Sequence, residues 1–204
     1  MRITPCVAAL TLGVSLVLGG CGGDEPTASD DANARADHNE VDVAFASDMI
    51  QHHAQALAMV DLTVERTLDP EVQQLAEEIR AAQAPEIETL TDWLNQWDEP
   101  IPATVNDHVN AEDGEHDMEG TDEDDTGMDM PGMMSDEEMA DLEAASDAEF
   151  QDMFLEMMIE HHEGAIEMAK SEQEDGQYAP AISLAAGIEA AQGTEIETME
   201  GLLS

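Results

Sequence analysis

FLEMMIEHHEGAIEM, residues 154–168, places a His-His pair inside an apolar pattern that has the period of an α-helix. The stretch FASDMIQHHAQALAM, residues 45–59, carries the same pattern 109 positions earlier, with His52 in the place of His161. In both copies a Met lies three residues before and another seven residues after the first His. Side chains at these intervals share one face of a helix. Each stretch therefore predicts a helix whose buried face contains histidine and methionine.

The repeat extends into a second segment of each copy. Five residues of segment 79–89 reappear in segment 188–198 at the same offset: Ile79, Gln83, Glu86, Ile87 and Thr89. A long match without a gap indicates an internal duplication. Each copy has the pattern of helix, turn and helix, and no stretch alternates as a strand does. The sequence predicts an all-α fold, a four-helix bundle built from two duplicated helix-turn-helix hairpins.

Turn and capping signals set the expected limits of the helices. We expect helices over residues 40–66, 70–97, 135–145, 146–174 and 180–204. Asp69 is the expected N-cap of the second helix, and Pro85 is expected to kink it. In an up-down-up-down bundle the two helices that carry the His-His pairs are diagonal and parallel. His52 and His161 would then lie at the same level.

The N-terminus resembles a bacterial lipoprotein signal peptide. It has a basic residue at Arg2, a short apolar run, and small residues directly before Cys21. We expect residues 1–20 to be removed and Cys21 to carry a lipid, which makes the protein an extracytoplasmic, membrane-anchored lipoprotein. A plain secretory signal with an incidental cysteine is the alternative. The apolar run is shorter than the ~20 residues that a membrane-spanning helix needs.

Composition divides the rest of the chain into a tether and one domain. Residues 21–39 are rich in small and polar residues and predict a flexible tether. Residues 40–204 form the duplicated bundle domain. Within it, residues 98–131 form an acidic linker that carries Met and His, including His108 and His116.

Charge and cysteine content exclude several classes of partner and site. Asp and Glu number 49 against 5 Lys and Arg, so the formal net charge is −44. Nucleic acids and anionic lipid head groups are therefore poor partners, and most of the carboxylates are expected to form a solvating surface. Cys6 leaves with the signal and Cys21 is acylated. No thiol remains as a nucleophile or a metal ligand.

The duplicated histidines, methionines and carboxylates predict a metal site in the core. Buried polar groups are costly unless a partner satisfies them. Imidazole together with thioether favours copper, especially Cu(I), or silver, whereas the Glu-x-x-His signature of di-iron bundles is absent. The candidate ligands are His52, His53, His161, His162, Met49, Met59, Met158, Met168, Glu86 and Glu195.

Three functions remain open at this point. The first is copper sequestration or delivery. The second is a structural or adaptor lipoprotein whose histidines form a polar core layer without metal. The third is a metal-dependent redox enzyme, which is disfavoured because the sequence has no nucleophile with a partnered base and no loop for an organic cofactor.

The paired motifs MIQHHAQALAM and MIEHHEGAIEMA resemble the secreted bacterial family known as domain of unknown function 305. The Gln-x-x-Glu-Ile segments at Gln83 and Gln192 and the segment PGMMSDEEMADL share this resemblance, which covers about Glu40 to Leu203. It implies a ferritin-like bundle that is usually exported or lipid-anchored. It also implies a link to copper handling, which some relatives have.

Overall fold

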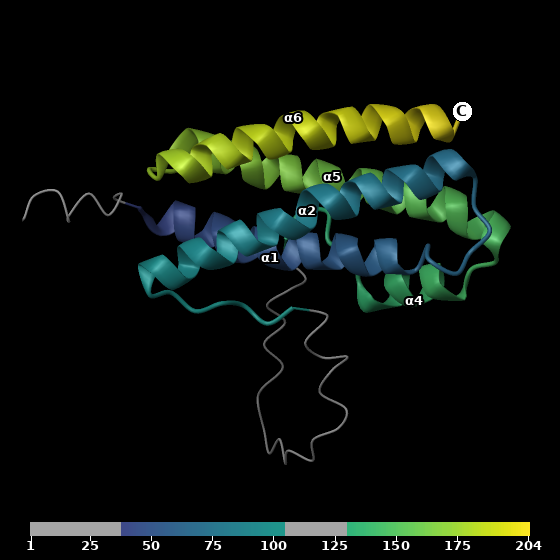
Figure 1. The fold of residues 1–204 in the computed structure, drawn as a ribbon, viewed down its shortest axis with the longest axis horizontal. Helices are drawn as coiled ribbons and strands as arrows, with labels where there is room; N and C mark the ends of the chain where they lie inside the picture. The colour runs from purple at the N-terminus through teal and green to yellow at the C-terminus, as the bar shows by residue number, and fades with distance from the viewer. Residues whose placement is uncertain (1–37, 105–129) are drawn as a thin grey trace, which may run out of the picture. The chain divides into compact units, whose positions relative to one another are not determined.

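A computed structural model describes residues 38–104 and 130–204 of the chain. The predicted signal peptide, Cys21, nearly all of the tether and most of the acidic linker, with His108 and His116, lie outside the described residues. The helices are α1 Glu40–Asp61, α2 Pro70–Trp97, α4 Asp136–Ala144, α5 Asp147–Asp175 and α6 Ala179–Leu202. Neither described range contains a strand. The prediction of an all-α fold is confirmed, and α1, α2, α5 and α6 form the bundle (Figure 1).

Most helix limits agree with the prediction, but the first helix is shorter. It ends at Asp61, and residues 62–66 form turns in place of the predicted last helical turn. The Thr63 hydroxyl donates to the carbonyl oxygen of Val60 at 2.7 Å, a local bond that competes with the helical ladder. Asp69 does occupy the N-cap of α2, but its side chain makes no capping bond and instead accepts a hydrogen bond from Gln151.

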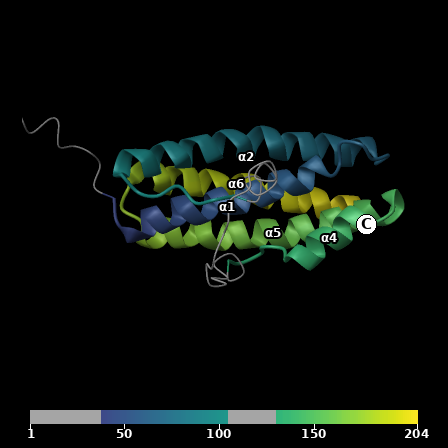
Figure 2. The same cartoon turned by 90° about the horizontal axis from the view of Figure 1, so that it is seen from below.

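The two hairpins pack with α1 antiparallel to α5, so the predicted parallel arrangement is wrong (Figures 1 and 2). At one end, the Asn39 side chain before α1 donates to the Asp175 carbonyl oxygen at the end of α5 (2.8 Å). At the other end, Arg66 after α1 lies 3.7 Å from the Asp147 carboxylate at the start of α5. The connection between α2 and α4, residues 98–135, is long enough to join opposite ends of the bundle. This is the ferritin-like order, with one long crossover.

The core consists of two apolar clusters. One contains Met59 of α1 and Met158 of α5, together with Phe150 and Phe154. The other contains Met49 of α1 and Ala169 of α5, together with aromatic residues near the end of α2. Because α1 and α5 are antiparallel, the residues that precede His52 lie on the same side as those that follow His161. The histidine pairs therefore lie between the two clusters.

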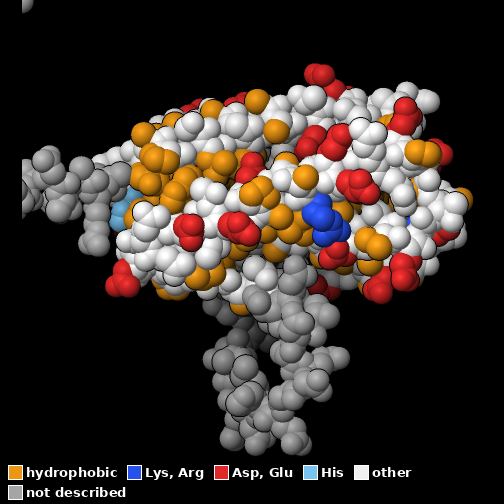
Figure 3. Space-filling model, in the orientation of Figure 1, with side chains coloured by type: hydrophobic (Ala, Val, Ile, Leu, Met, Phe, Trp, Pro, Cys, Tyr) orange, Lys and Arg blue, Asp and Glu red, His pale blue; other side chains and the backbone are white. Residues whose placement is uncertain are grey.

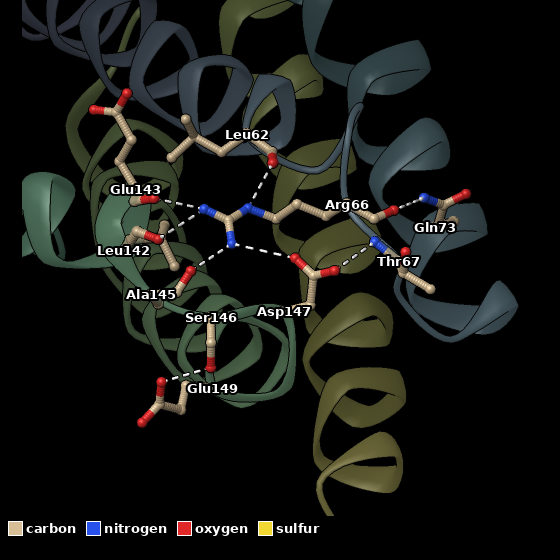
Figure 4. A network of polar contacts seen from close by, with 10 residues as sticks. All are labelled: Leu62, Arg66, Thr67, Gln73, Leu142, Glu143, Ala145, Ser146, Asp147 and Glu149. Carbon is tan, nitrogen blue, oxygen red and sulfur yellow. Dashed lines mark hydrogen bonds and ion pairs between the residues drawn. The ribbon is translucent and has the colours of Figure 1, made fainter.

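Arg66 joins the α1–α2 turn, α4 and the start of α5 (Figure 4). Its guanidinium donates to the carbonyl oxygens of Ala145 (2.7 Å) and Glu143 (2.6 Å) at the end of α4, and to that of Leu62 (3.1 Å). The guanidinium carbon also lies 3.9 Å from the centre of the Phe150 ring. The last carbonyl groups of a helix have no partner inside it, and here an arginine supplies donors for them.

Acidic side chains are distributed over the face of the bundle that Figure 3 shows. Apolar side chains lie between them on this face. No helix in the described part of the chain combines the length and the apolar character needed to span a membrane.

Candidate metal centre

His52 of α1 and His161 of α5 meet in the middle of the bundle. Their ring centroids are 3.8 Å apart with the planes at 45°, and both side chains are 0% exposed. Each histidine lies near the middle of its helix, so antiparallel packing of two equivalent helices brings the two rings together. The two rings are in contact and tilted against each other. A metal ion would bind at a ring nitrogen, whose lone pair lies in the plane of the ring.

The second histidine of each pair contacts a carboxylate of the same half. His53 Nε2 lies 2.7 Å from Glu86 Oε2, and His162 Nε2 lies 2.7 Å from Glu195 Oε2. Because a carboxylate only accepts, the proton of each neutral imidazole is on Nε2. In that neutral form, Nδ1 of each ring carries the free lone pair. The two halves of the duplication build the same contact.

His52 has the same tautomer for a different reason. The backbone carbonyl oxygen of Pro131 lies 3.0 Å from His52 Nε2 and can only accept. His52 Nδ1 therefore carries the free lone pair. His161 differs from the other three histidines: neither ring nitrogen makes a well-formed hydrogen bond within the described protein, although the backbone of His52 is close enough to raise its pKa slightly against the larger effect of burial.

The histidine pairs form a layer of buried polar atoms without protein partners. Among the described residues these atoms include Nδ1 of His52, His53, His161 and His162, together with side-chain atoms of Gln83 and Gln192. An unsatisfied buried polar group costs about 1–3 kcal/mol, so such groups are rare in native proteins. Histidines that bind metals usually donate their other N–H to a carboxylate or a carbonyl, as three of these four do. The layer therefore suits a metal ion, and water is the alternative partner.

Burial keeps the central histidines uncharged. It lowers the pKa of His52 to about 3, and the neighbouring His53 and His162 contribute to that shift. Burial also holds the pKa of His161 well below its usual value, again with a contribution from the other histidines. Only the neutral imidazole binds a metal. Both rings are therefore in the binding form at neutral pH.

The methionines of the candidate site flank this layer on both sides. Met49, Met59 and Met158 are fully buried in the two apolar clusters, and Met168 is partly buried against one of them. Residues 38–104 and 130–204 contain no group of three or more His, Cys, Asp or Glu side chains placed to hold one metal ion. The available donors, imidazole with thioether nearby, suit a soft ion of low coordination number.

Sequence reasoning missed the contact between the end of the acidic linker and the layer. Gly164 of α5 lies directly against Pro131 and Gly132, and Gln55 of α1 forms two hydrogen bonds with the backbone of Met134. An isolated glycine inside a helical pattern usually has a packing reason. Gly164 was thus the one feature of the sequence that pointed to a close contact on this face of α5. The segment that makes the contact could not be identified from sequence.

Comparison with known proteins gives one family and several solved structures. The family model "Domain of unknown function (DUF305)" matches residues 42–203. No curated protein matches the chain. A DUF305 protein from Streptomyces coelicolor, predicted to be secreted, is 32% identical, with a TM-score of 0.65 over 80% of this chain and 91% of that one.

Two other structures extend the comparison. A DUF305 fragment from Deinococcus radiodurans is 29% identical, with a TM-score of 0.65 over 81% of this chain and 97% of the fragment. CopM in its Cu(II)-bound form is 26% identical, with a TM-score of 0.61 over 79% of this chain and 95% of CopM. The fold is thus shared with a protein that binds copper.

Proposed function

We propose that this chain, which belongs to the DUF305 family, binds copper or a similarly soft metal ion at its paired histidines. Metal binding occurs among its structural relatives, since CopM has been solved with Cu(II) bound. The observation that carries the proposal is the buried layer of four imidazoles whose Nδ1 atoms have no protein partner.

The residues of the layer take different roles in this proposal. His52 and His161, one from each half, are the central ligands. His53 and His162 lie beside them, each oriented by a carboxylate, Glu86 or Glu195. Thioether sulfur for a soft ion would come from the flanking methionines, Met49, Met59, Met158 and Met168.

Sequestration or delivery outside the cytoplasm is the role we propose for this site. The Streptomyces coelicolor relative is predicted to be secreted, and lipid attachment at Cys21 would hold the protein in the cell envelope. The formal charge of −44 attracts cations in general. Selectivity would then come from the histidines and not from the surface.

A double His52→Ala, His161→Ala variant tests the proposal. We expect it to bind Cu(I) and Ag(I) at least about 100-fold more weakly than the parent, because both central ligands are lost. The measurement is stoichiometry and affinity by competition with a chelator, with circular dichroism to report that the bundle is folded. His108→Ala with His116→Ala in the acidic linker is the matched control. Retained tight binding in the double variant would overturn the proposal, and so would a parent that binds these ions no better than a carboxylate surface does.

Removing the two orienting carboxylates gives a second, smaller effect. Glu86→Gln with Glu195→Gln keeps the side-chain shape but removes the charge that holds Nε2–H of each histidine. We expect metal affinity to fall about 10-fold, since such partners are typically worth 10–100-fold. The control is Glu88→Gln with Glu197→Gln, two exposed residues on the same helices. Equal affinities in both pairs would show that these carboxylates do not tune the site.

The affinity measurement on the His52→Ala, His161→Ala variant also separates the proposal from its rival, a structural lipoprotein whose histidines form a polar core layer. In that case the His52→Ala, His161→Ala variant would change the stability of the bundle and leave its metal affinity equal to that of the parent.

A further inference from the structure

A short non-helical segment before α4, residues 131–134, lies against the central histidines, and we call it the strap. Its first residue, Pro131, accepts the hydrogen bond from His52 Nε2 at 3.0 Å. Its last residue, Met134, is held by Gln55, whose Nε2 donates to the Met134 carbonyl at 2.7 Å and whose Oε1 accepts from the Met134 N–H at 2.8 Å. The strap is therefore fixed to α1 at both ends.

Two glycines make room for the strap against α5. A β-carbon at Gly164 would overlap the Pro131 carbonyl and lie 2.7 Å from the nitrogen of Gly132. Gly132 has a φ of +74°, and a β-carbon there would lie 2.5 Å from the Glu160 carbonyl oxygen. The three atoms nearest to a β-carbon at Gly164 all belong to the strap. A glycine at position 164 is therefore needed for the close approach of the strap and not for the packing of α5 against another helix.

The strap is the part of the site that breaks the symmetry of the duplication. Gly164 occupies the position equivalent to Gln55, at the same offset of 109 that relates His161 to His52. The first copy supplies three hydrogen bonds to the strap, two from Gln55 and one from His52. The second copy supplies space for the strap at Gly164. The histidine–carboxylate contacts of the two halves are equal at 2.7 Å, whereas the Pro131 carbonyl of the strap contacts His52 of one half.

We propose that the strap positions His52 for metal binding and covers the site, so that it slows release of the ion. This inference rests on the proposed metal site. The Pro131 carbonyl holds the His52 proton on Nε2 and leaves Nδ1 as the ligand atom, which is the role of a partner outside the metal's own ligands. The strap makes no such hydrogen bond to His161, whose ring is fully buried against that of His52.

Gly164→Ala tests this inference, because the added methyl group displaces the strap while α5 gains a better helix former. In the metal-free full chain, long-range ¹H–¹⁵N NMR of the imidazoles should show His52 as the Nε2–H tautomer in the parent and as a mixture in the variant. Release of Ag(I) to a chelator should be about 10-fold faster in the variant. Gly187→Ala is the matched control, since a β-carbon at Gly187 meets no atom within 4 Å.

Gln55→Ala provides the same test without adding an atom to α5, and it decides the question if Gly164→Ala does not fold. If the strap has only a structural role, the variants should change the unfolding temperature but leave the His52 tautomer and the Ag(I) release rate at parent values. That result would overturn the inference about the strap and leave the proposed metal site standing. If the His52→Ala, His161→Ala variant binds Ag(I) as tightly as the parent, the proposed function fails and the inference falls with it.

Discussion

Replacing Arg66 with Ala is expected to destabilise the bundle by about 3 kcal/mol, and to lower its unfolding temperature by about 6–12 °C. The guanidinium donates to carbonyl oxygens of Leu62, Glu143 and Ala145 from different segments (Figure 4). Without it, the end of α4 has carbonyl groups that lack these donors. The contact with the Phe150 ring is also lost.

Arg80→Ala is the matched control for this substitution. Arg80 also pairs with an aspartate, Asp61, but both side chains are largely exposed, at 40% and 57%. Exposed ion pairs contribute about 0–1 kcal/mol. Thermal unfolding of the two variants should therefore differ clearly. The unfolding temperature of Arg66→Lys should lie closer to that of Arg66→Ala than to that of the parent. The planar guanidinium has several N–H donors that point at different carbonyl oxygens, and the compact ammonium group of lysine cannot replace them all. Similar unfolding temperatures for Arg66→Ala and Arg80→Ala would show that Arg66 does not join these elements.

Two buried carboxyl groups, Asp42 and Glu172, lie near each other where α1 begins and α5 ends, and both are 0% exposed. Burial alone would raise the pKa of Asp42, but hydrogen bonds from the backbone N–H groups of Asn39, Tyr178 and Gln177 outweigh it and lower that pKa. Burial raises the pKa of Glu172 to about 8, and the neighbouring Asp42 adds to the shift. At neutral pH, the protonated form of Glu172 therefore predominates.

This pair predicts a loss of stability as the pH rises. The pKa of Glu172 is about 8 when folded, against an ordinary value of 4.5. Its contribution to stability is thus complete below pH 4.5, falls between 4.5 and 8, and is absent above 8. Glu172→Gln cannot lose a proton. Its free energy of unfolding should rise relative to the parent by up to about 1.4 kcal/mol per pH unit in this window, or about 3 kcal/mol from pH 5.5 to 8.

Urea unfolding of the parent and the variant at several pH values measures this difference, and other titrating groups cancel in the comparison. Glu174→Gln, an exposed residue on the same helix, is the control and should follow the parent at every pH. A constant difference between Glu172→Gln and the parent across the window would show that Glu172 is already ionised at neutral pH.

The duplicated pattern around the two His-His pairs was sufficient to predict the helices, the bundle and the family. Hydrophobic periodicity is a local property, and each stripe must be buried against another helix. For the same reason, the burial of His52 and His161 and the nearness of Glu86 and Glu195 could be predicted from their positions along the helices. The proposal of a soft metal likewise rests on residue types, imidazole with thioether.

Only the tertiary structure decided how the two hairpins are oriented. Parallel and antiparallel packing of α1 and α5 bury the same stripes, so periodicity cannot distinguish them. His52 and His161 meet in either case, because both lie near the middle of their helices. No local pattern records the direction, because a connection as long as residues 98–135 is compatible with both arrangements.

Contacts between distant segments were likewise decided by the tertiary structure. The strap touches His52 across 79 residues of sequence, and Asp42 accepts hydrogen bonds from residues more than 130 positions away. These contacts depend on backbone carbonyl and N–H groups, which every residue carries. The sequence therefore determined which side chains are buried together, and the fold determined which backbone groups satisfy them.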